Sequence, residues 1–304
     1  MKPAADGVGA SASQAADRRT RFIGIACGIA IIVLFSGFTL VSRLGLATSL
    51  KLIDIAALRF SIGGLLLLPV LLRHGFSGIR LRDAAALAFF GGLGFASCAY
   101  TGFMLAPASH GAVLLHGTLP LFTALLAWSM SSEKAHGRRR LGLLAILVGI
   151  LAMAWDSVAA STSRQLLGDG ALLLASACWS AYGVLARRLS LAPAHTASIV
   201  AVLSMACFVP IYLALPGKAI FVASWRELLL QAVFQGVLIG AASAFIYARA
   251  VASLGAVDTA LFTAAVPCVT TISAFFLLGE VPSSLALCGV VVVTMGMAVS
   301  MKSP

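Results

Sequence analysis

Long apolar stretches without a charged residue recur along almost the whole chain and are separated by short polar connections. Six of them contain 20 residues or more, at 22–42, 84–106, 111–130, 228–248, 259–279 and 281–301. Four shorter or interrupted stretches lie at 55–72, 141–155, 170–186 and 196–216. An α-helix needs about 20 residues to cross the hydrocarbon core of a bilayer. The pattern therefore predicts an all-α integral membrane protein with ten transmembrane helices.

The composition agrees with this prediction. Of the 304 residues, 61% are hydrophobic and 10% are charged, whereas a typical soluble domain is roughly half apolar and a quarter charged. The apolar stretches are rich in Gly, Ala, Leu and Val, and small residues allow membrane helices to pack closely. They lack the two-residue alternation that is typical of strands in a membrane barrel. We therefore expect helices surrounded by lipid.

Basic residues are distributed unevenly between the connections. The net charge is +11, and if the amino terminus is cytoplasmic, 15 of the 21 Lys and Arg residues fall on the cytoplasmic side. Arg59 lies within a helix, and the other side holds Arg43, Lys51, Arg164, Lys218 and Arg226. This asymmetry follows the positive-inside rule with both termini in the cytoplasm. The distribution of basic residues thus indicates how the chain is oriented in the inner (plasma) membrane. It also argues against nucleic-acid binding as the reason for the net positive charge.

The amino-terminal residues differ from the rest of the chain. Residues 1–20 contain Ala, Ser and Asp without periodicity, which predicts a disordered cytoplasmic tail. The first apolar stretch follows basic residues, as in a signal peptide, but it is long and no small-residue cleavage site clearly follows it. We expect it to be an uncleaved first helix. All six cysteines fall inside apolar stretches without metal-ligand spacing, which is typical of small buried hydrophobes.

The two halves of the chain resemble each other at an offset of 147 residues. The equivalent pairs are Tyr100 and Tyr247, Pro120 and Pro267, Glu133 and Glu280, Gly142 and Gly289, and Gly149 and Gly296. At an offset of 144, Ser36 and Ser180 also correspond. The pattern predicts two five-helix repeats, at 21–156 and 168–302. Because five is odd, the second repeat enters the membrane from the opposite side, and inverted repeats of this kind are typical of secondary transporters with a solute site near the midplane.

The motifs within the repeats resemble the drug/metabolite transporter superfamily, and within it the EamA family, over about residues 22–301. The resemblance rests on Ala-Leu-Arg-Phe at Ala57–Phe60, on the Ala-Pro-Ala-Ser-His-Gly-Ala run from Ala106, and on Ser253-Leu-Gly-Ala in the second half. Ser131-Ser132 departs from the Leu-Gly that often precedes the Glu in such proteins. The resemblance implies ten helices, cytoplasmic termini and alternating access driven by an ion gradient or by exchange. It favours export of amino acids or related metabolites, and it leaves uptake, for instance of a vitamin, as the alternative.

Polar residues at seven-residue spacing follow one face of the fourth helix and of its counterpart in the second half. These positions are Ser109, His116 and Thr123, matched by Ala256, Thr263 and Thr270. Pro120 and Pro267 lie beside them and remove a backbone donor. The face is expected either to line a solute path or to form ordinary hydrogen bonds between helices. His116 is able to bind a carboxylate or carry a proton, and a neutral histidine bonded to a hydroxyl is the equal alternative.

The candidate solute-binding residues come from both halves of the chain. They are Ser36, Thr39, Tyr100, His116, Trp179, Tyr182, Gln235 and Thr263. For the aromatic members, ordinary packing or an interfacial belt is the alternative. Arg59 lies only four residues into its apolar stretch, so we expect its side chain to extend to the outer surface.

Signatures of enzymes are missing from the sequence. It contains no Gly-rich phosphate loop, no HExxH and no GxSxG motif, so neither catalysis nor a cofactor or metal is expected. The expected partners are a small-molecule solute, the lipid bilayer, and either protons or an exchanged solute, with a homodimer left open. An intramembrane enzyme and a non-transporting sensor are the hypotheses from other classes.

Overall fold

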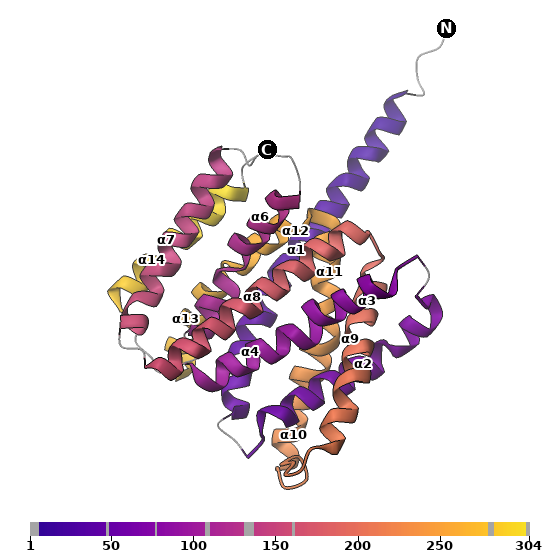
Figure 1. Cartoon of the computed structure of the whole chain (residues 1–304). Helices are drawn as coiled ribbons and strands as arrows, with labels where there is room; N and C mark the ends of the chain where they lie inside the picture. The colour runs from indigo at the N-terminus through magenta and orange to yellow at the C-terminus, as the bar shows by residue number, and fades with distance from the viewer. Residues whose placement is uncertain are drawn as a thin grey trace.

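A computed structural model describes residues 6–46, 49–76, 78–106, 110–130, 137–159, 162–278 and 283–301. Within these ranges the regular structure is helical throughout (Figure 1). Eight helical segments of the described chain are long and apolar enough to cross a membrane, at Arg18–Ser42, Leu52–His74, Leu81–Leu105, Gly111–Ser129, Ser163–Leu189, Pro193–Ala214, Trp225–Leu254 and Ala256–Ser273. Helices α7 and α14 complete the ten transmembrane helices that the hydropathy pattern predicts.

The first half of the chain contributes five of these helices, and some consist of several segments. They are α1 (Asp6–Leu46), α2 (Leu52–His74), the third helix with α3 (Leu81–Ala88), η1 (Phe89–Leu93) and α4 (Gly94–Leu105), the fourth with η2 (Gly111–Gly117) and α6 (Leu119–Met130), and α7 (Gly137–Ala159). Helix α1 begins at Asp6, within the stretch for which the sequence predicts a disordered tail. That stretch contains several Ala residues, which have the highest helix propensity.

The second half repeats this arrangement. Its helices are α8 (Ser163–Leu189), α9 (Pro193–Ala214), the eighth helix with α10 (Trp225–Gln231), η3 (Ala232–Ser243) and α11 (Ala244–Leu254), the ninth with α12 (Ala256–Thr263) and α13 (Val266–Leu278), and α14 (Ser284–Met301). The π-helical segments η1 and η3 occur in equivalent helices of the two halves. Such segments often mark functional sites because they widen the helix locally.

Packing between the helices follows the internal symmetry. Helix α1 packs on α11, α12 and α13, and its counterpart α8 packs on α4, η2 and α6. Helix α2 likewise packs on α9 and η3, while α9 packs on α2, α3 and η1. Each of these contacts joins one half of the chain to the other. The solute path predicted between the halves would therefore be lined by both repeats.

Helices α7 and α14 lie side by side in Figure 1 and approach each other at glycines. A Cβ atom on Gly142 would lie 2.6 Å from the carbonyl oxygen of Gly296, and one on Gly149 would lie 2.8 Å from that of Gly289. The lower number on α7 thus faces the higher number on α14, so the two helices are antiparallel. This direction is the one that an inverted pair of repeats requires.

The fold places apolar side chains outside and polar ones inside. Phe22, Leu72 and Phe276 are each more than 70% exposed, whereas Thr39, Gln235 and Thr263 are at most 1% exposed. Lipid would cover the outer surface. We call the end of the bundle with Arg139, Arg187 and Gly255 the terminal end, because α1 begins and α14 ends there (Figure 1). The other end, with Lys51, Asp169 and Gly217, is the opposite end.

Candidate functional site

Aromatic rings from three helices gather at the centre of the bundle. Phe35 of α1, Trp179 and Tyr182 of α8, and Tyr247 of α11 form this central cluster. The ring centroids of Phe35 and Trp179 are 5.7 Å apart, those of Trp179 and Tyr247 are 5.2 Å apart, and those of Tyr182 and Tyr247 are 5.7 Å apart. All four side chains are at most 5% exposed. The cluster therefore fills the space between the two halves.

His116 borders the central cluster. Its ring centroid is 5.0 Å from that of Phe35, and its side chain is 2% exposed. The residue lies in η2, a π-helix that ends at Gly117, so the α-helical spacing predicted for Ser109, His116 and Thr123 applies only beyond that residue. The π-helical turn has i→i+5 hydrogen bonds, which rotate the face relative to an α-helix. Ser109 itself lies outside the described residues.

Several buried polar atoms around the central cluster have no hydrogen-bond partner within the described chain. They are His116 Nδ1, Tyr100 Oη, Trp179 Nε1, Tyr182 Oη and Tyr247 Oη. An unpaired polar group costs about 1–3 kcal/mol when it is buried. These atoms come from both halves and border one region. Such a concentration is typical of a site where a polar ligand or water supplies the missing partners in another conformation.

Arg59 is buried near the same region, which corrects the expectation that its side chain reaches the outer surface. The residue is 5% exposed, and its guanidinium carbon lies 5.6 Å from the ring centroid of Phe38 and 5.4 Å from that of Phe95. Phe95 in turn packs on Trp179 at 4.6 Å between ring centroids. Aromatic faces attract a cation, so the rings of Phe38 and Phe95 favour a position of the guanidinium group inside the bundle over one at the outer surface.

Hydroxyl groups of the two halves bond symmetrically across the centre. Ser36 Oγ on α1 donates to the carbonyl of Val266 at 3.5 Å, and Ser180 Oγ on α8 donates to that of Leu119 at 3.1 Å. Both acceptors immediately precede a proline. Thr39 Oγ1 donates within its own helix, to the carbonyl of Phe35 at 3.4 Å. These hydroxyls thus have protein partners, and the aromatic and imidazole groups do not.

Contacts between the halves close the opposite end of the bundle. We call this set the opposite-end clamp; it consists of Gln235 Nε2 to Ser42 Oγ at 3.0 Å, Gln231 Nε2 to the carbonyl of Val41 at 3.2 Å, His110 Nδ1 to Asp169 Oδ1 at 2.6 Å, and Tyr212 Oη to Asp54 Oδ1 at 2.6 Å. Each bond joins a residue of the first half to one of the second. All these side chains are buried, so the clamp separates the centre from that side.

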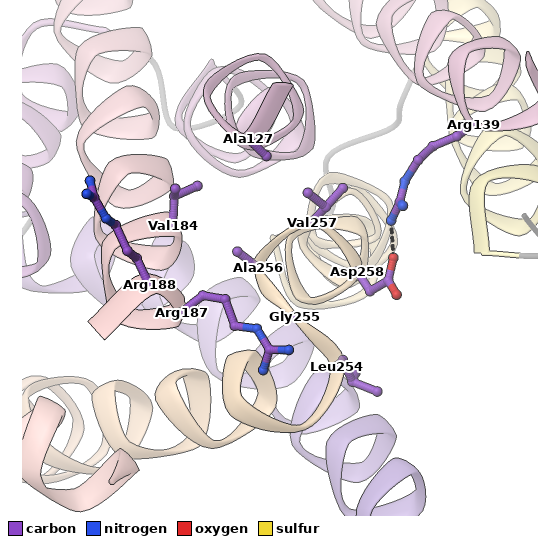
Figure 2. Close-up of a pocket in the computed structure, with 10 residues that line it drawn as sticks. All are labelled: Ala127, Arg139, Val184, Arg187, Arg188, Leu254, Gly255, Ala256, Val257 and Asp258. Carbon is purple, nitrogen blue, oxygen red and sulfur yellow. Dashed lines mark hydrogen bonds and ion pairs between the residues drawn. The ribbon is translucent and has the colours of Figure 1, made fainter. Parts of the chain in front are cut away.

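The terminal end, in contrast, contains a cavity of about 690 Å³ (Figure 2). We call it the vestibule; it is lined by Ala127, Arg139, Val184, Arg187, Arg188, Leu254, Gly255, Ala256, Val257 and Asp258. Arg139 of α7 forms an ion pair with Asp258 of α12. Arg187 extends across the cavity toward the last turn of α11, where its Nη1 donates to the carbonyl of Ala252 at 3.1 Å. The lining carries three arginines and one aspartate, so it attracts anions.

Residues of the same two helices, α8 and α11, line the vestibule and form part of the central cluster. Tyr182 precedes Arg187 by five residues on α8, and Tyr247 precedes Leu254 by seven on α11, which corresponds to about 7 and 10 Å along a helix. A Cβ atom on Gly183 would lie 2.7 Å from Tyr247 Oη, so this tyrosine packs directly on the backbone of α8. Tyr182 and Tyr247 therefore separate the vestibule from the centre in this conformation.

All eight solute-binding candidates from the sequence are buried in the structure. Trp179, Tyr182 and His116 belong to the centre or border it, and Tyr100 reaches the same region through Phe38, with 6.2 Å between their ring centroids. Gln235 lies in the opposite-end clamp. Residues that sequence reasoning missed are Arg59, Phe35, Phe95 and the pair His110 and Asp169. For Arg59, Phe35 and Phe95 the signal was a charged or aromatic residue within an apolar stretch, whereas His110 and Asp169 lie just before such stretches.

Comparisons with known proteins agree with the repeat and with the fold. The family model described as "EamA-like transporter family" matches residues 22–155 and again residues 166–302. A protein of Bacillus subtilis (strain 168), described as "Uncharacterized transporter YyaM", is 25% identical over 234 residues, which are 72% of this chain and 75% of that protein. A solved crystal structure aligns with a TM-score of 0.70 and 20% identity over 93% of this chain and 100% of its own, and this likeness concerns the fold alone. Since the family model matches both halves of the chain, the protein belongs to the EamA-like transporter family of the drug/metabolite transporter superfamily.

Proposed function

We propose that the protein is a secondary transporter that exports amino acids or related small metabolites from the cytoplasm by alternating access. The solute would bind at the centre of the bundle, between the two repeats. Membership of a transporter family supports transport as such. The substrate class and the direction are our proposal, and we expect the chain to have no catalytic activity.

The observation that carries the proposal is the group of unpartnered polar atoms around the central cluster. His116 Nδ1, Trp179 Nε1 and Tyr182 Oη are buried without partners, and they lie between a closed end and an open one. A polar ligand would bind well here. The protein has already removed these polar atoms from water, so each hydrogen bond to the ligand meets a group that otherwise has no partner. A sensor or scaffold would have no need to leave them unpaired.

The open vestibule supports loading from the cytoplasm. If the terminal end faces the cytoplasm, as the positive-inside rule predicts, the vestibule opens to the compartment in which an exporter collects its solute. Rocking of the repeats would then break the opposite-end clamp and close the vestibule. The ion pair between Arg139 and Asp258 already joins the two halves at the terminal end.

Flux into proteoliposomes tests the proposal. Purified protein would be reconstituted and given a panel of labelled amino acids, nucleosides and vitamins, with and without a pH gradient. We expect movement of one amino acid or related compound, faster in the direction that leaves the cytoplasmic side. Specific flux of a vitamin in the inward direction would favour the uptake alternative. Absence of flux for every solute, from folded protein, would contradict transport and favour a sensor or an intramembrane enzyme.

His116→Leu tests the position of the site. Leucine fills a similar volume and removes an unpartnered buried nitrogen, so we expect thermal stability to be kept or raised and flux to fall about tenfold or more, the effect of losing one hydrogen bond of about 1.4 kcal/mol. His74→Leu, at the end of α2 and exposed, is the matched control. Unchanged flux in His116→Leu would show that the central cluster is packing alone.

A further inference from the structure

Arg59 is a buried cation without a countercharge. Its Nη1 atom has no hydrogen-bond partner, and it forms no ion pair within the described ranges. The carboxylates of the described chain that have contacts are engaged elsewhere: Asp54 with Tyr212, Asp83 with Arg82, Asp169 with His110, Glu227 with Ser49, and Asp258 with Arg139. A charged side chain inside a membrane protein is costly and is typically paired or functional.

The rings around Arg59 hold it but do not replace an anion. Phe38, Phe60 and Phe95 lie 5.4 to 6.0 Å from its guanidinium carbon. Cation–π attraction acts on the face of the guanidinium group, whereas its N–H groups lie in the plane and need acceptors. The aromatic contacts therefore orient the guanidinium plane and leave at least the Nη1 donors free.

Two further polar groups lie beside this guanidinium. Tyr100 Oη, which is able to donate and to accept, interacts with Arg59 but has no hydrogen bond of good geometry. Trp179 Nε1, a donor only, is unpartnered, and Trp179 and Arg59 line the same small cavity. No carboxylate of the described chain is paired with these groups, so they form a site for an anionic group. The planar fork of arginine matches the two oxygens of a carboxylate.

The cavity beside Arg59 is nearly closed in this conformation. Its volume is about 10 Å³, far below the several hundred Å³ of a typical ligand pocket. A solute therefore reaches Arg59 only in a conformation in which this cavity is wider. Three arginines line the vestibule at the terminal end, so an anion entering there would move from one basic region to another.

We propose that Arg59 binds the carboxylate of the transported solute, and that Phe38, Phe95 and Trp179 contact its apolar or aromatic body. This proposal rests on the transport function proposed above and narrows its substrate class to small carboxylates. Tyr100 and Trp179 donate the remaining hydrogen bonds to the carboxylate. Uncharged solutes of the same shape are rejected because they leave the guanidinium unpaired.

The test compares benzoate with benzamide, which share a shape and differ in charge. Binding would be measured in detergent by the shift in melting temperature and by quenching of Trp179 in a variant with Trp128, Trp155 and Trp225 replaced by Phe. We expect benzoate to bind about 10- to 100-fold more tightly than benzamide, the range of a charge-assisted hydrogen bond. Arg59→Met should abolish this preference, and Arg59→Lys should keep part of it.

Stability separates a binding role from a structural one. A buried unpaired charge carries a desolvation cost that an apolar residue of similar length avoids, so Arg59→Met should melt at the same temperature as the natural chain or higher. Arg164→Met, at an exposed position near the start of α8, is the matched control and should keep the preference for benzoate. A lowered melting temperature with the preference intact would overturn the proposal.

The remaining outcomes distinguish the two proposals. Solute flux that is independent of Arg59 would overturn the carboxylate site and leave transport standing. Arg59-dependent binding of benzoate without flux of any solute would support the site and contradict transport. Equal binding of benzoate and benzamide, or no effect of benzoate up to its solubility limit, would overturn the carboxylate site.

Discussion

At the scale of single residues, a side chain of the second half meets a backbone group that a proline exposes in the first half. Pro120 has no N–H, so the carbonyl of His116 four residues earlier loses its usual donor. Thr263 of the second half offers a replacement: its Oγ1 lies 3.1 Å from that carbonyl oxygen and 2.7 Å from the carbonyl oxygen of Ala260 in its own helix, and its one proton is shared between the two. Freed carbonyls are tolerated in a membrane only where protein or water meets them. The proline and the threonine therefore depend on each other.

Thr263→Val should destabilise the protein because it leaves the carbonyl of His116 without a donor while keeping the side-chain volume. Hydrogen bonds between membrane helices contribute about 0.6 kcal/mol on average and up to about 1.7, and we expect a loss in this range, measured as a lower melting temperature in detergent. Pro120→Ala restores an N–H near this carbonyl, so it should reduce the effect of Thr263→Val in the double variant.

The control for this prediction is Thr259→Val. Thr259 Oγ1 donates to the carbonyl of Gly255 within its own helix, at 2.7 Å, and that carbonyl has no proline four residues later. The substitution should therefore cost less than Thr263→Val. Equal losses for the two variants would show that the bond across the halves contributes nothing specific.

At the scale of elements, the contact between α7 and α14 depends on glycines at a spacing of seven residues. Close approach of two helix backbones requires residues without side chains. Gly142, Gly149, Gly289 and Gly296 supply them on both helices, and a Cβ atom on any of these residues would lie within 3 Å of a backbone atom of the partner helix. The helix pair is held by packing along this seam.

Gly149→Ala should destabilise the protein by about 1–3 kcal/mol, because the added methyl group overpacks the seam. Gly170→Ala is the matched control, since a Cβ atom there meets nothing within 4 Å. In the control the helix propensity of alanine should raise stability by about 0.5–1 kcal/mol. Melting temperatures in detergent measure both. If the melting temperatures of both variants shift in the same direction, close packing at the seam is not what distinguishes Gly149 from Gly170.

At the scale of the whole molecule, the structure is closed at the opposite end and open at the terminal end. The opposite-end clamp joins the two halves through buried side chains, and the vestibule of about 690 Å³ lies at the other end. Alternating access requires that these two features exchange. A change in the clamp should therefore alter the balance between conformations more than it alters the fold.

Gln235→Leu should shift the protein toward a conformation that is open at the opposite end, because it removes the bond to Ser42. A membrane hydrogen bond of up to about 1.7 kcal/mol corresponds to a change of up to about 18-fold in the population ratio. The readout is the rate at which a membrane-impermeant maleimide labels a cysteine at Thr39, in a background without the six natural cysteines. We expect faster labelling from the opposite end.

Gln165→Leu serves as the control for this measurement. Gln165 is near the start of α8, where its side chain caps Thr162 of the same helix, and it joins no element of the other half. Its substitution should leave the labelling rate at position 39 unchanged. Slower or equal labelling in Gln235→Leu would indicate that the clamp does not hold the opposite end closed.

The sequence by itself determined the ten helices, the two repeats and the inverted relation between them. Each of these follows from a local property or from comparison at a fixed offset: length and hydropathy decide whether a helix crosses the bilayer, and an odd number of helices inverts the second copy. The match of Gly142 and Gly149 with Gly289 and Gly296 was visible in the sequence, and the structure showed that these residues face each other.

Only the tertiary structure decided the surroundings of the charged residues and which end is open. Arg59 lies near one end of its apolar stretch, and sequence reasoning directed it outward; Phe38 and Phe95, which attract it inward, come from other helices. His110 and Asp169 are 59 residues apart and meet only because α8 packs on η2. Contacts between side chains distant in sequence depend on which helices pack together and on which faces, and the hydropathy of a segment does not predict either.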